Sequence, residues 1–398
     1  MTYMKSVILK PGRSNPFKQQ HPWLFSGAID RLTGNPLAGD TVKVCDDKAV
    51  FIAYGLFNPH SQIRVRLYSF DEHAPLNNDF WQDKIKQAIH LREVTLGFKP
   101  TKDSAYRLIN SEADGLSGLT VDRFGNYLSI QFTSLGIYQH KDIIVESLVK
   151  YCKPKGIILR TEQDILAEEG LELKDGIIWG EIPQEALIIK ENGVSFEVNL
   201  ATGQKTGFYL DQRANRTLIE KYAKGKTVLD LCTYSGGFAL HAAKAGANQV
   251  TAVDVSAGAL QLAERNAALN NFANISFIKS DMFKYLVDCV AGGIKYDIIV
   301  LDPPKMTHSK GSANQALTGY FKLNLIALKC LNPGGILFTC SCSGRISKTD
   351  FLTVLHNAAL SADRSLRVLE VKGADCDHPV SVHCPESEYL KCLVCYAE

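Results

Sequence analysis

The chain has 398 residues, more than one compact core usually holds, so we expect two or three domains. Apolar residues make up 45% of the chain and charged residues 22%, which is typical of soluble globular proteins and excludes a largely disordered chain. Its 44 basic and 42 acidic side chains leave a net charge of +2, and this overall balance does not indicate a nucleic-acid partner.

No apolar run approaches the roughly 20 residues that a membrane-spanning helix needs, and the first residues lack the apolar core of a signal peptide. We therefore expect the protein in the cytoplasm, with no membrane partner. In that reducing compartment its eleven cysteines are expected to be thiols. A cysteine with a special role would then be a ligand or a nucleophile.

Residues 1–72 are predicted to form a small β-rich domain. Short runs of β-favouring residues lie at 41–44, 49–53 and 63–68, and proline and glycine turns separate them. Residues 1–70 carry nine basic and only four acidic side chains. Such an excess is typical of a phosphate-binding surface, although it is at least as often a solvated face.

The pattern predicts a separate α+β domain over residues 73–190. It combines an amphipathic helix at 78–96 with strands such as 127–132 and 156–160. No repeat or low-complexity tract interrupts it.

Residues 191–398 alternate apolar strands with helices, which is the pattern of a parallel sheet with crossover helices. We expect a doubly wound, Rossmann-like α/β domain here. Ser256 is a good N-cap for a helix that carries Leu260, Ala263 and Ala267 on one face. The expected strands span 226–231, 250–255, 275–278, 296–301 and 336–340, and a further helix spans 313–331.

In such a sheet, ligands bind beyond the carboxyl ends of the strands. The first strand ends in a turn whose glycines, Gly236 and Gly237, let the backbone approach a ligand and open a helix whose positive end favours an anionic group. The Gly-x-Gly-x-x-Gly spacing that seats a pyrophosphate is missing, which favours a nucleoside without phosphates. The candidate contacts in this segment are Asp230, Tyr234, Ser235, Gly236, Gly237 and Phe238.

The next two strands end in acids. Asp254, about 20 residues past the glycine turn, is suited to accept ribose hydroxyl protons, and Asp281 is suited to an adenine amino group. Either acid alone is equally well explained as a helix N-cap. Together, the glycine turn and the two acids indicate S-adenosyl-L-methionine as the cofactor, and hence a methyltransferase.

The fourth strand ends in Leu301-Asp-Pro-Pro304, which Lys305 follows. The two prolines stiffen this loop, so that it can hold a planar base beside the methyl donor. In amino-group methyltransferases an aromatic residue usually follows such a Pro-Pro pair and stacks on the base. Lys305 takes that position here, which disfavours methylation of an exocyclic amine.

Two cysteines mark the end of the following strand, and Cys342 lies just beyond it among small residues that leave its sulfur accessible. Carbon 5 of a pyrimidine is too weak a nucleophile to take a methyl group unaided. A thiolate that adds to carbon 6 makes carbon 5 enamine-like, and cysteine suits this role because it attacks well and also leaves. We interpret Cys342 as this nucleophile and Cys340 as a small core residue, the commonest fate of a free cysteine.

A metal site is the competing interpretation of the last segment, which contains Cys376, His378, His383, Cys384, Cys392 and Cys395. Cys392 and Cys395 have the spacing of half a zinc site. Their flanking residues instead predict a final strand, and no second pair of ligands is well spaced. The sequence therefore predicts no metal.

With these residues, the chain resembles the RlmI-like family of 23S ribosomal RNA cytosine-5 methyltransferases over essentially its whole length. Segment 107–123 is similar to the family's middle-domain signature, and segment 203–213 to the motif before its methyltransferase core. Asp377-His-Pro379 and Tyr389-Leu-Lys391 are similar to motifs near its end. Together these motifs are highly specific.

The resemblance implies an N-terminal PUA domain, a linking α+β domain and a class I methyltransferase fold. It implies that Cys342 is the nucleophile and that no second cysteine stands in the Asp-Pro-Pro loop, which leaves the base that removes the carbon 5 proton unidentified. Asp302 is the best candidate to bind the cytosine amino group or ring N3, and it also borders the cofactor. Segment 208–213 is expected to close over the cofactor, with Phe208, Gln212 and Arg213 as contacts.

The resemblance also implies 23S rRNA, or a large-subunit precursor, as the partner, and it leaves a homodimer open. The candidate RNA contacts are Arg13, Lys18, His21, Trp23, Arg64 and Arg66. Trp23 is either a stacking ring or a core residue of the small domain. The alternative functions are C5 methylation of uridine, N7 methylation of guanine, and an RNA-binding assembly factor without turnover. Carboxylates at three strand ends argue against the last.

Overall fold

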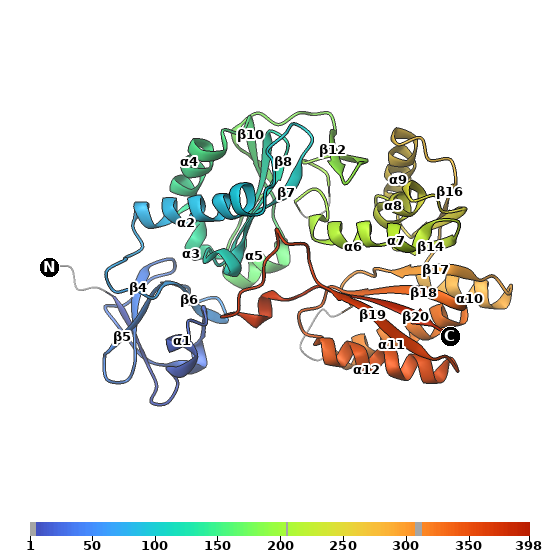
Figure 1. Ribbon diagram of the computed structural model, residues 1–398. Helices are drawn as coiled ribbons and strands as arrows, with labels where there is room; N and C mark the ends of the chain where they lie inside the picture. Colours follow the sequence, from blue (N-terminus) through green and yellow to red (C-terminus); the bar gives the residue numbers. More distant parts are fainter. Residues whose placement is uncertain (1–4, 204–205, 307–312) are drawn as a thin grey trace. The chain divides into compact units, whose positions relative to one another are not determined.

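The chain folds into two compact units in the computed structural model, which describes residues 5–203, 206–306 and 313–398. Figure 1 labels their helices and strands. Unit 1 contains the described residues up to Ile189, together with Val198–Leu210 and Cys376–Ser387. Unit 2 contains Lys190–Glu197, Asp211–Asp375 and Glu388–Glu398. Gln204 and Lys205, within the motif at 203–213, lie outside the described residues.

The N-terminal part of unit 1 is a six-stranded sheet in the order β2-β6-β5-β4-β1-β3. Its elements are β1 (Ser6–Leu9), α1 (Asn15–Lys18), β2 (Trp23–Phe25), β3 (Ile29–Thr33), β4 (Thr41–Cys45), β5 (Phe51–Phe57) and β6 (Ile63–Ser69). Val7, Val42 and Val65 are fully buried in its core. The predicted β-rich N-terminal fold is confirmed.

The second part of unit 1 is a five-stranded sheet in the order β11-β10-β9-β8-β7. Its strands are β7 (Ala105–Asn110), β8 (Leu119–Phe124), β9 (Tyr127–Phe132), β10 (Gly156–Leu159) and β11 (Gly176–Gly180). Its helices are α2 (Asn78–His90), α3 (Leu135–Tyr138), α4 (Lys141–Cys152) and α5 (Gln163–Glu169). The helix predicted over 78–96 changes type, because Leu91–Thr95 form a π-helical turn. Tyr68 packs edge-to-face on Trp81 at 5.1 Å between ring centroids, so the two sheets share a core.

The Asp377-His-Pro379 motif anchors a distant segment to unit 1. The Arg107 N–H donates to the buried Asp377 carboxylate at 2.9 Å. The Arg107 side chain in turn pairs with Asp122, a fully buried acid that also accepts a hydrogen bond from Thr206. These contacts join three of the motifs that carry the family resemblance. In these positions the motifs serve the fold of unit 1.

Unit 2 is built on a seven-stranded sheet in the order β16-β15-β14-β17-β18-β20-β19. Strands β14 to β18 run parallel, and β20 is antiparallel to both neighbours. The strands are β14 (Thr227–Leu231), β15 (Gln249–Asp254), β16 (Ile275–Lys279), β17 (Tyr296–Leu301), β18 (Leu331–Ser341), β19 (Leu366–Lys372) and β20 (Lys391–Ala397). A short hairpin of β12 (Leu187–Glu191) and β13 (Val194–Val198) precedes them. The predicted doubly wound fold is confirmed.

Helices cover both faces of the unit 2 sheet (Figure 1). They are α6 (Arg213–Leu218), α7 (Glu220–Ala223), α8 (Gly237–Lys244), α9 (Ala257–Leu269), α10 (Met282–Ala291), α11 (Ala313–Lys329) and α12 (Lys348–Ser361). Ile299 of β17 packs in the core with α11 and α12, whereas the preceding residue, Ile298, packs in the core with α8. Parallel strands buried on both faces explain the continuous apolar runs in the sequence.

The N-cap predicted at Ser256 matches the structure, whereas the helix predicted over 313–331 is shorter than expected. Ser256 accepts a hydrogen bond from the Ala259 N–H at 3.2 Å, which confirms the predicted N-cap of α9. The helix predicted to reach residue 331 ends at Lys329, because the fully buried Leu331 already pairs with Tyr296 in the sheet. No helix in the described part of the chain is long and apolar enough to span a membrane.

Candidate active site

Four loops leave the unit 2 sheet at the same edge. β14, β15, β17 and β18 run parallel and lie next to one another in the sheet, so their carboxyl ends coincide. The chain order reverses between β14 and β17, and open α/β sheets bind ligands at such a switch point. The sheet thus brings the predicted cofactor loop, Asp254, Asp302 and Cys342 to one edge.

The turn after β14 has left-handed backbone conformations at Cys232 (φ 61°), Tyr234 (φ 49°) and Gly236 (φ 86°). Residues other than glycine rarely adopt them, and they concentrate at functional sites. The Tyr234 N–H donates to Asp254 at 2.9 Å, and Asn266 donates to the Ser235 carbonyl at 2.9 Å. These hydrogen bonds hold the turn in a single conformation. Asn266 was not predicted, since an asparagine inside a helix gives no signal of such a contact.

The turn fits S-adenosylmethionine better than a nucleotide with phosphates. A Cβ on Gly237 would lie 2.6 Å from Cδ of Arg216, so glycine is required at the start of α8. Asp230, Asp254 and Asp302 lie close enough to interact electrostatically. This accumulation of negative charge suits a sulfonium cation and repels phosphate.

Asp230 lies beneath the turn and binds backbone. Its carboxylate is only 1% exposed and accepts hydrogen bonds from Thr233 at 2.6 Å and from the Ala239 N–H at 3.0 Å. The Asp230 carboxylate thus supports the start of α8, and its direct contact with the cofactor stays a prediction. Burial, opposed by these two hydrogen bonds and reinforced by the charges of Asp302 and Asp254, raises the pKa of Asp230 to about 7.

We expect the affinity for S-adenosylmethionine to rise from pH 6 to pH 8. A raised carboxyl pKa means that Asp230 holds its proton at low pH and loses it as the pH passes about 7. The added negative charge attracts the sulfonium cation, with a gain of about threefold to tenfold. Isothermal titration at several pH values measures the effect, with S-adenosylhomocysteine, which lacks the sulfonium charge, as the control ligand. Asp230→Asn, which keeps the shape, should flatten the profile, and an unchanged slope in this variant would contradict the assignment.

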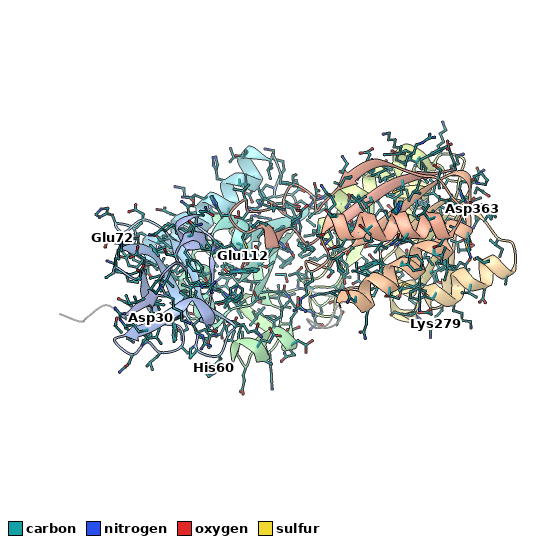
Figure 2. The ribbon with its side chains drawn as sticks, turned by 90° about the horizontal axis from the view of Figure 1, so that it is seen from below. Asp30, His60, Glu72, Glu112, Lys279 and Asp363 are labelled. Carbon is teal, nitrogen blue, oxygen red and sulfur yellow. The ribbon has the colours of Figure 1, made fainter. Side chains whose placement is uncertain are left out.

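The other two acids at the strand ends differ in their contacts. Asp254 accepts the N–H groups of Tyr234 and Ser256 with separate oxygens, each at 2.9 Å, and is half-buried. Asp281 caps α10 by accepting the N–H groups of Phe283 at 2.9 Å and Lys284 at 3.0 Å. The N-cap explanation therefore holds for Asp281, which is exposed and follows β16, the strand that ends at Lys279 (Figure 2). The ribose and adenine contacts stay predictions.

The loop after β18 brings Cys342 to the Asp-Pro-Pro segment. Its Sγ lies 4.0 Å from the carbonyl oxygen of Pro303, next to the half-buried Asp302. Cys342 is itself half-buried, whereas Cys340 is fully buried among apolar side chains. The interpretation of Cys340 as a core residue is confirmed.

A second half-buried cysteine, Cys232, lies in the turn after β14 at the same edge. Burial and the charges of Asp254 and Asp302 raise its pKa well above the usual thiol value. Because the thiolate is the reactive form, this environment makes Cys232 a poor nucleophile. Cys342 is thus the better candidate of the two.

Two aromatic residues predicted to contact the cofactor are buried. Phe238 is 4% exposed and packs against Phe338 in the core, with 6.3 Å between ring centroids. Only its backbone is therefore available to a ligand, and its contact with the cofactor stays a prediction. Phe208 is 4% exposed within unit 1, and its contact with the cofactor stays a prediction.

Gln212 and Arg213 belong to unit 2 and have partners there. The Gln212 side chain is buried and accepts a hydrogen bond from Asn215 at 2.7 Å. Arg213 forms an ion pair with Asp375 at 2.9 Å. Because Asp375 already neutralises the charge of Arg213, the ion pair as a whole would bring no net charge to the predicted contact with the cofactor.

A buried charged network, which the sequence did not reveal, supports α8. Arg216 donates to both carboxylate oxygens of Glu191, each at 2.6 Å. His241 of α8 lies 2.6 Å from Glu220 and 3.3 Å from Glu191. Burial alone would raise the pKa of Glu191, but Arg216 and His241 outweigh it and lower this pKa to about 2. Arginines and acids at these sequence spacings are common on protein surfaces, so the sequence pattern did not predict a buried network.

The side chains of two predicted RNA contacts have partners inside unit 1, and their contacts with RNA stay predictions. The Arg66 side chain is 11% exposed and forms ion pairs with Glu112 at 3.4 Å and Glu169 at 3.2 Å. Trp23 is half-buried and donates from Nε1 to Glu112, which Figure 2 labels, at 3.0 Å. These contacts join the N-terminal sheet of unit 1 to its second part.

The remaining basic candidates are more accessible. Arg13 is exposed, and the Lys18 side chain is 50% exposed beside Asp46, to which it forms an ion pair at 2.8 Å. Arg64 is half-buried and donates to the carbonyl of Pro59. Arg13 and Lys18 stay candidates for phosphate contacts.

One group of metal-binding side chains comes together in unit 1. The ligand atoms of His21, Cys384 and Glu386 lie within 4.8 Å of one another. His21 Nδ1 accepts the Trp23 N–H at 3.2 Å, so the ring proton is on Nε2, 3.3 Å from Glu386. This tautomer has no free lone pair for a metal. Cys392, part of the spacing that resembles a zinc site, is fully buried on β20.

Known proteins resemble this chain over almost its full length. A sequence profile for S-adenosylmethionine-dependent methyltransferases matches residues 176–381, and one for PUA-like domains matches residues 7–70. A protein of Photobacterium profundum named Ribosomal RNA large subunit methyltransferase I is 41% identical over 397 residues, 99% of each chain. A protein of Shewanella frigidimarina with the same name is 42% identical over 391 residues, 98% of each chain.

The fold has counterparts of known structure. The methyltransferase SMU.776, solved in complex with SAH, superposes with a TM-score of 0.85 at 24% identity and covers 98% of this chain and 99% of its own. A SAM-dependent methyltransferase from Streptococcus mutans superposes with a TM-score of 0.84 at 24% identity, with the same coverage. With a full-length sequence match and the glycine turn at the switch point, the chain belongs to the RlmI-like family of S-adenosylmethionine-dependent methyltransferases.

Proposed function

We propose that the protein transfers a methyl group from S-adenosylmethionine to carbon 5 of a cytosine in 23S rRNA, through a covalent adduct between Cys342 and carbon 6. The observation that carries this proposal is the position of Cys342, half-buried with its Sγ 4.0 Å from the Pro303 carbonyl, at the edge that holds the cofactor turn. The names of the relatives support large-subunit rRNA, or a precursor particle, as the substrate.

The reaction needs a thiolate and then a base. The Cys342 thiolate forms a bond to carbon 6 of the cytosine, and the electrons of the 5,6 double bond make carbon 5 nucleophilic. S-adenosylmethionine, when bound, supplies the electrophilic methyl group. A base then removes the carbon 5 proton, the double bond re-forms, and the sulfur leaves carbon 6. Half-buried Asp302 is suited to bind the cytosine amino group or ring N3 and so to orient the ring.

Nucleoside analysis of the product tests this proposal. Unmodified rRNA is incubated with labelled S-adenosylmethionine, digested and separated, and bisulfite sequencing then locates the modified base. The expected product is 5-methylcytidine. Label in 5-methyluridine or 7-methylguanosine would replace the proposal with one of these activities, and a lack of any label on both naked RNA and precursor particles would favour a non-catalytic assembly factor.

A further inference from the structure

Lys391 is a buried cation next to the loop that carries Cys342. It begins β20 and pairs in register with Ser341, the last residue of β18. The residue is 3% exposed. Its Nζ donates hydrogen bonds to the Ser343 carbonyl at 2.5 Å and to the Tyr389 carbonyl at 2.9 Å. The ammonium group is therefore bound to the residue that directly follows Cys342.

A buried ammonium group is costly unless negative charge compensates it. Within the described parts of the chain, no carboxylate lies within ion-pair distance of Lys391. Burial lowers the pKa of Lys391, and the charges of Cys342 and Glu388 oppose this shift. When ionised, the Cys342 sulfur is one of two negative charges that act on this cation, and it is the one that belongs to the candidate active site.

The other cysteines of these two strands have no such partner. Cys340 and Cys392 pair across β18 and β20, and mutual contact and burial raise the pKa of Cys340. Burial raises the pKa of Cys395 to about 12. The environments of Cys340 and Cys395 favour the neutral thiol, whereas Lys391 places a positive charge near Cys342.

We propose that Lys391 is a positioning residue that fixes the Cys342 loop through the Ser343 carbonyl and stabilises the Cys342 thiolate with its charge. This inference rests on the proposed function, in which Cys342 attacks as a thiolate. It gives the Tyr389-Leu-Lys391 motif a role at the site. In the free enzyme the Cys342 proton passes to solvent, and Lys391 keeps its own protons.

The test measures how fast each cysteine of the full-length protein reacts with iodoacetamide at different pH values, with mass spectrometry to resolve the sites. Only the thiolate reacts. For wild type we expect a Cys342 midpoint below the ordinary thiol value of roughly 8.5. Lys391→Met should reduce the Cys342 rate at pH 7 about tenfold, which corresponds to a midpoint shift of about one pH unit, whereas Lys391→Arg should keep most of the rate.

Lys372→Met is the matched control, because Lys372 pairs with Cys392 from the neighbouring strand β19 but its side chain is 48% exposed. It should leave the Cys342 profile unchanged. A wild-type midpoint at or above roughly 8.5 overturns the proposal even if Lys391→Met does not fold. Equal profiles for wild type and a folded Lys391→Met variant overturn it as well, since a purely structural lysine would affect stability and leave the profile in place.

The assay uses no RNA and no cofactor, so its outcome is independent of the proposed function. If Cys342→Ala still methylates rRNA while Lys391→Met shifts the Cys342 profile, the covalent mechanism fails and the thiolate assignment stands. If Cys342→Ala is inactive but the profiles do not differ, the mechanism stands and the role of Lys391 fails.

Discussion

Cys342→Ala is expected to lower the rate of rRNA methylation by at least about 10³-fold, because it removes the nucleophile that the proposed mechanism needs to activate carbon 5. The variant should bind S-adenosylmethionine as wild type does, since the glycine turn and its acids lie in other loops. Single-turnover transfer of label to unmodified rRNA measures the rate. Cys376→Ser is the control, because Cys376 is an exposed cysteine of unit 1.

Trapping of the adduct gives an independent readout. In RNA that contains 5-fluorocytidine, fluorine replaces the proton that must leave carbon 5, so the methylated adduct cannot break down. Wild type should form a complex stable to denaturation, with the nucleotide on the peptide that contains Cys342. A trapped complex in Cys342→Ala, or methylation at the wild-type rate, would be incompatible with the mechanism.

Arg216→Met is expected to destabilise unit 2 by about 3 to 5 kcal/mol, because it takes the two-pronged arginine ion pair away from the buried Glu191. The loss should be greatest around α8, whose His241 also contacts Glu191 and whose first residue, Gly237, packs on Arg216. The cofactor affinity should fall with it. Hydrogen exchange of the peptides that cover β14 and α8 measures the local free energy of opening.

A double variant separates the effect of the unpaired charge on stability from the effect of lost side-chain packing. Replacing both partners, in Arg216→Met with Glu191→Leu, should recover much of the lost stability, since no unpaired charge remains. The stability that Glu191 contributes depends on pH, because folding lowers its pKa to about 2. This contribution to the free energy of unfolding is complete above about pH 4.5 and is lost as the pH falls toward 2. Exchange rates in Arg216→Met that match wild type would refute the assigned role.

The sequence predicted the parts of the fold that depend on local pattern. The strand at 296–301 and the N-cap at Ser256 match the structure, because apolar runs and capping residues act over a few positions. The gathering of the candidate loops at one edge of the sheet followed from the same pattern, since parallel strands bring their carboxyl ends together.

Roles that depend on long-range partners were beyond such reasoning. Arg66 and Asp230 belong to residue types that bind RNA and cofactor, and only the tertiary structure shows that Glu169 and the Ala239 N–H occupy them. Lys391 was recognised as part of a motif, but its neighbour Ser343 lies 48 residues away in the chain. A pattern read along the chain contains no information on such pairs.

The chain returns from unit 2 to unit 1 near its end, and this affects when contacts within unit 1 can form during synthesis. Residues Cys376–Ser387 belong to unit 1, although most of unit 2 precedes them. During synthesis, the hydrogen bond from the Arg107 N–H to Asp377 can therefore form only after nearly the whole polypeptide has left the ribosome. A nascent chain that ends before Cys376 therefore lacks one segment of unit 1 and, with Glu388–Glu398, one segment of unit 2.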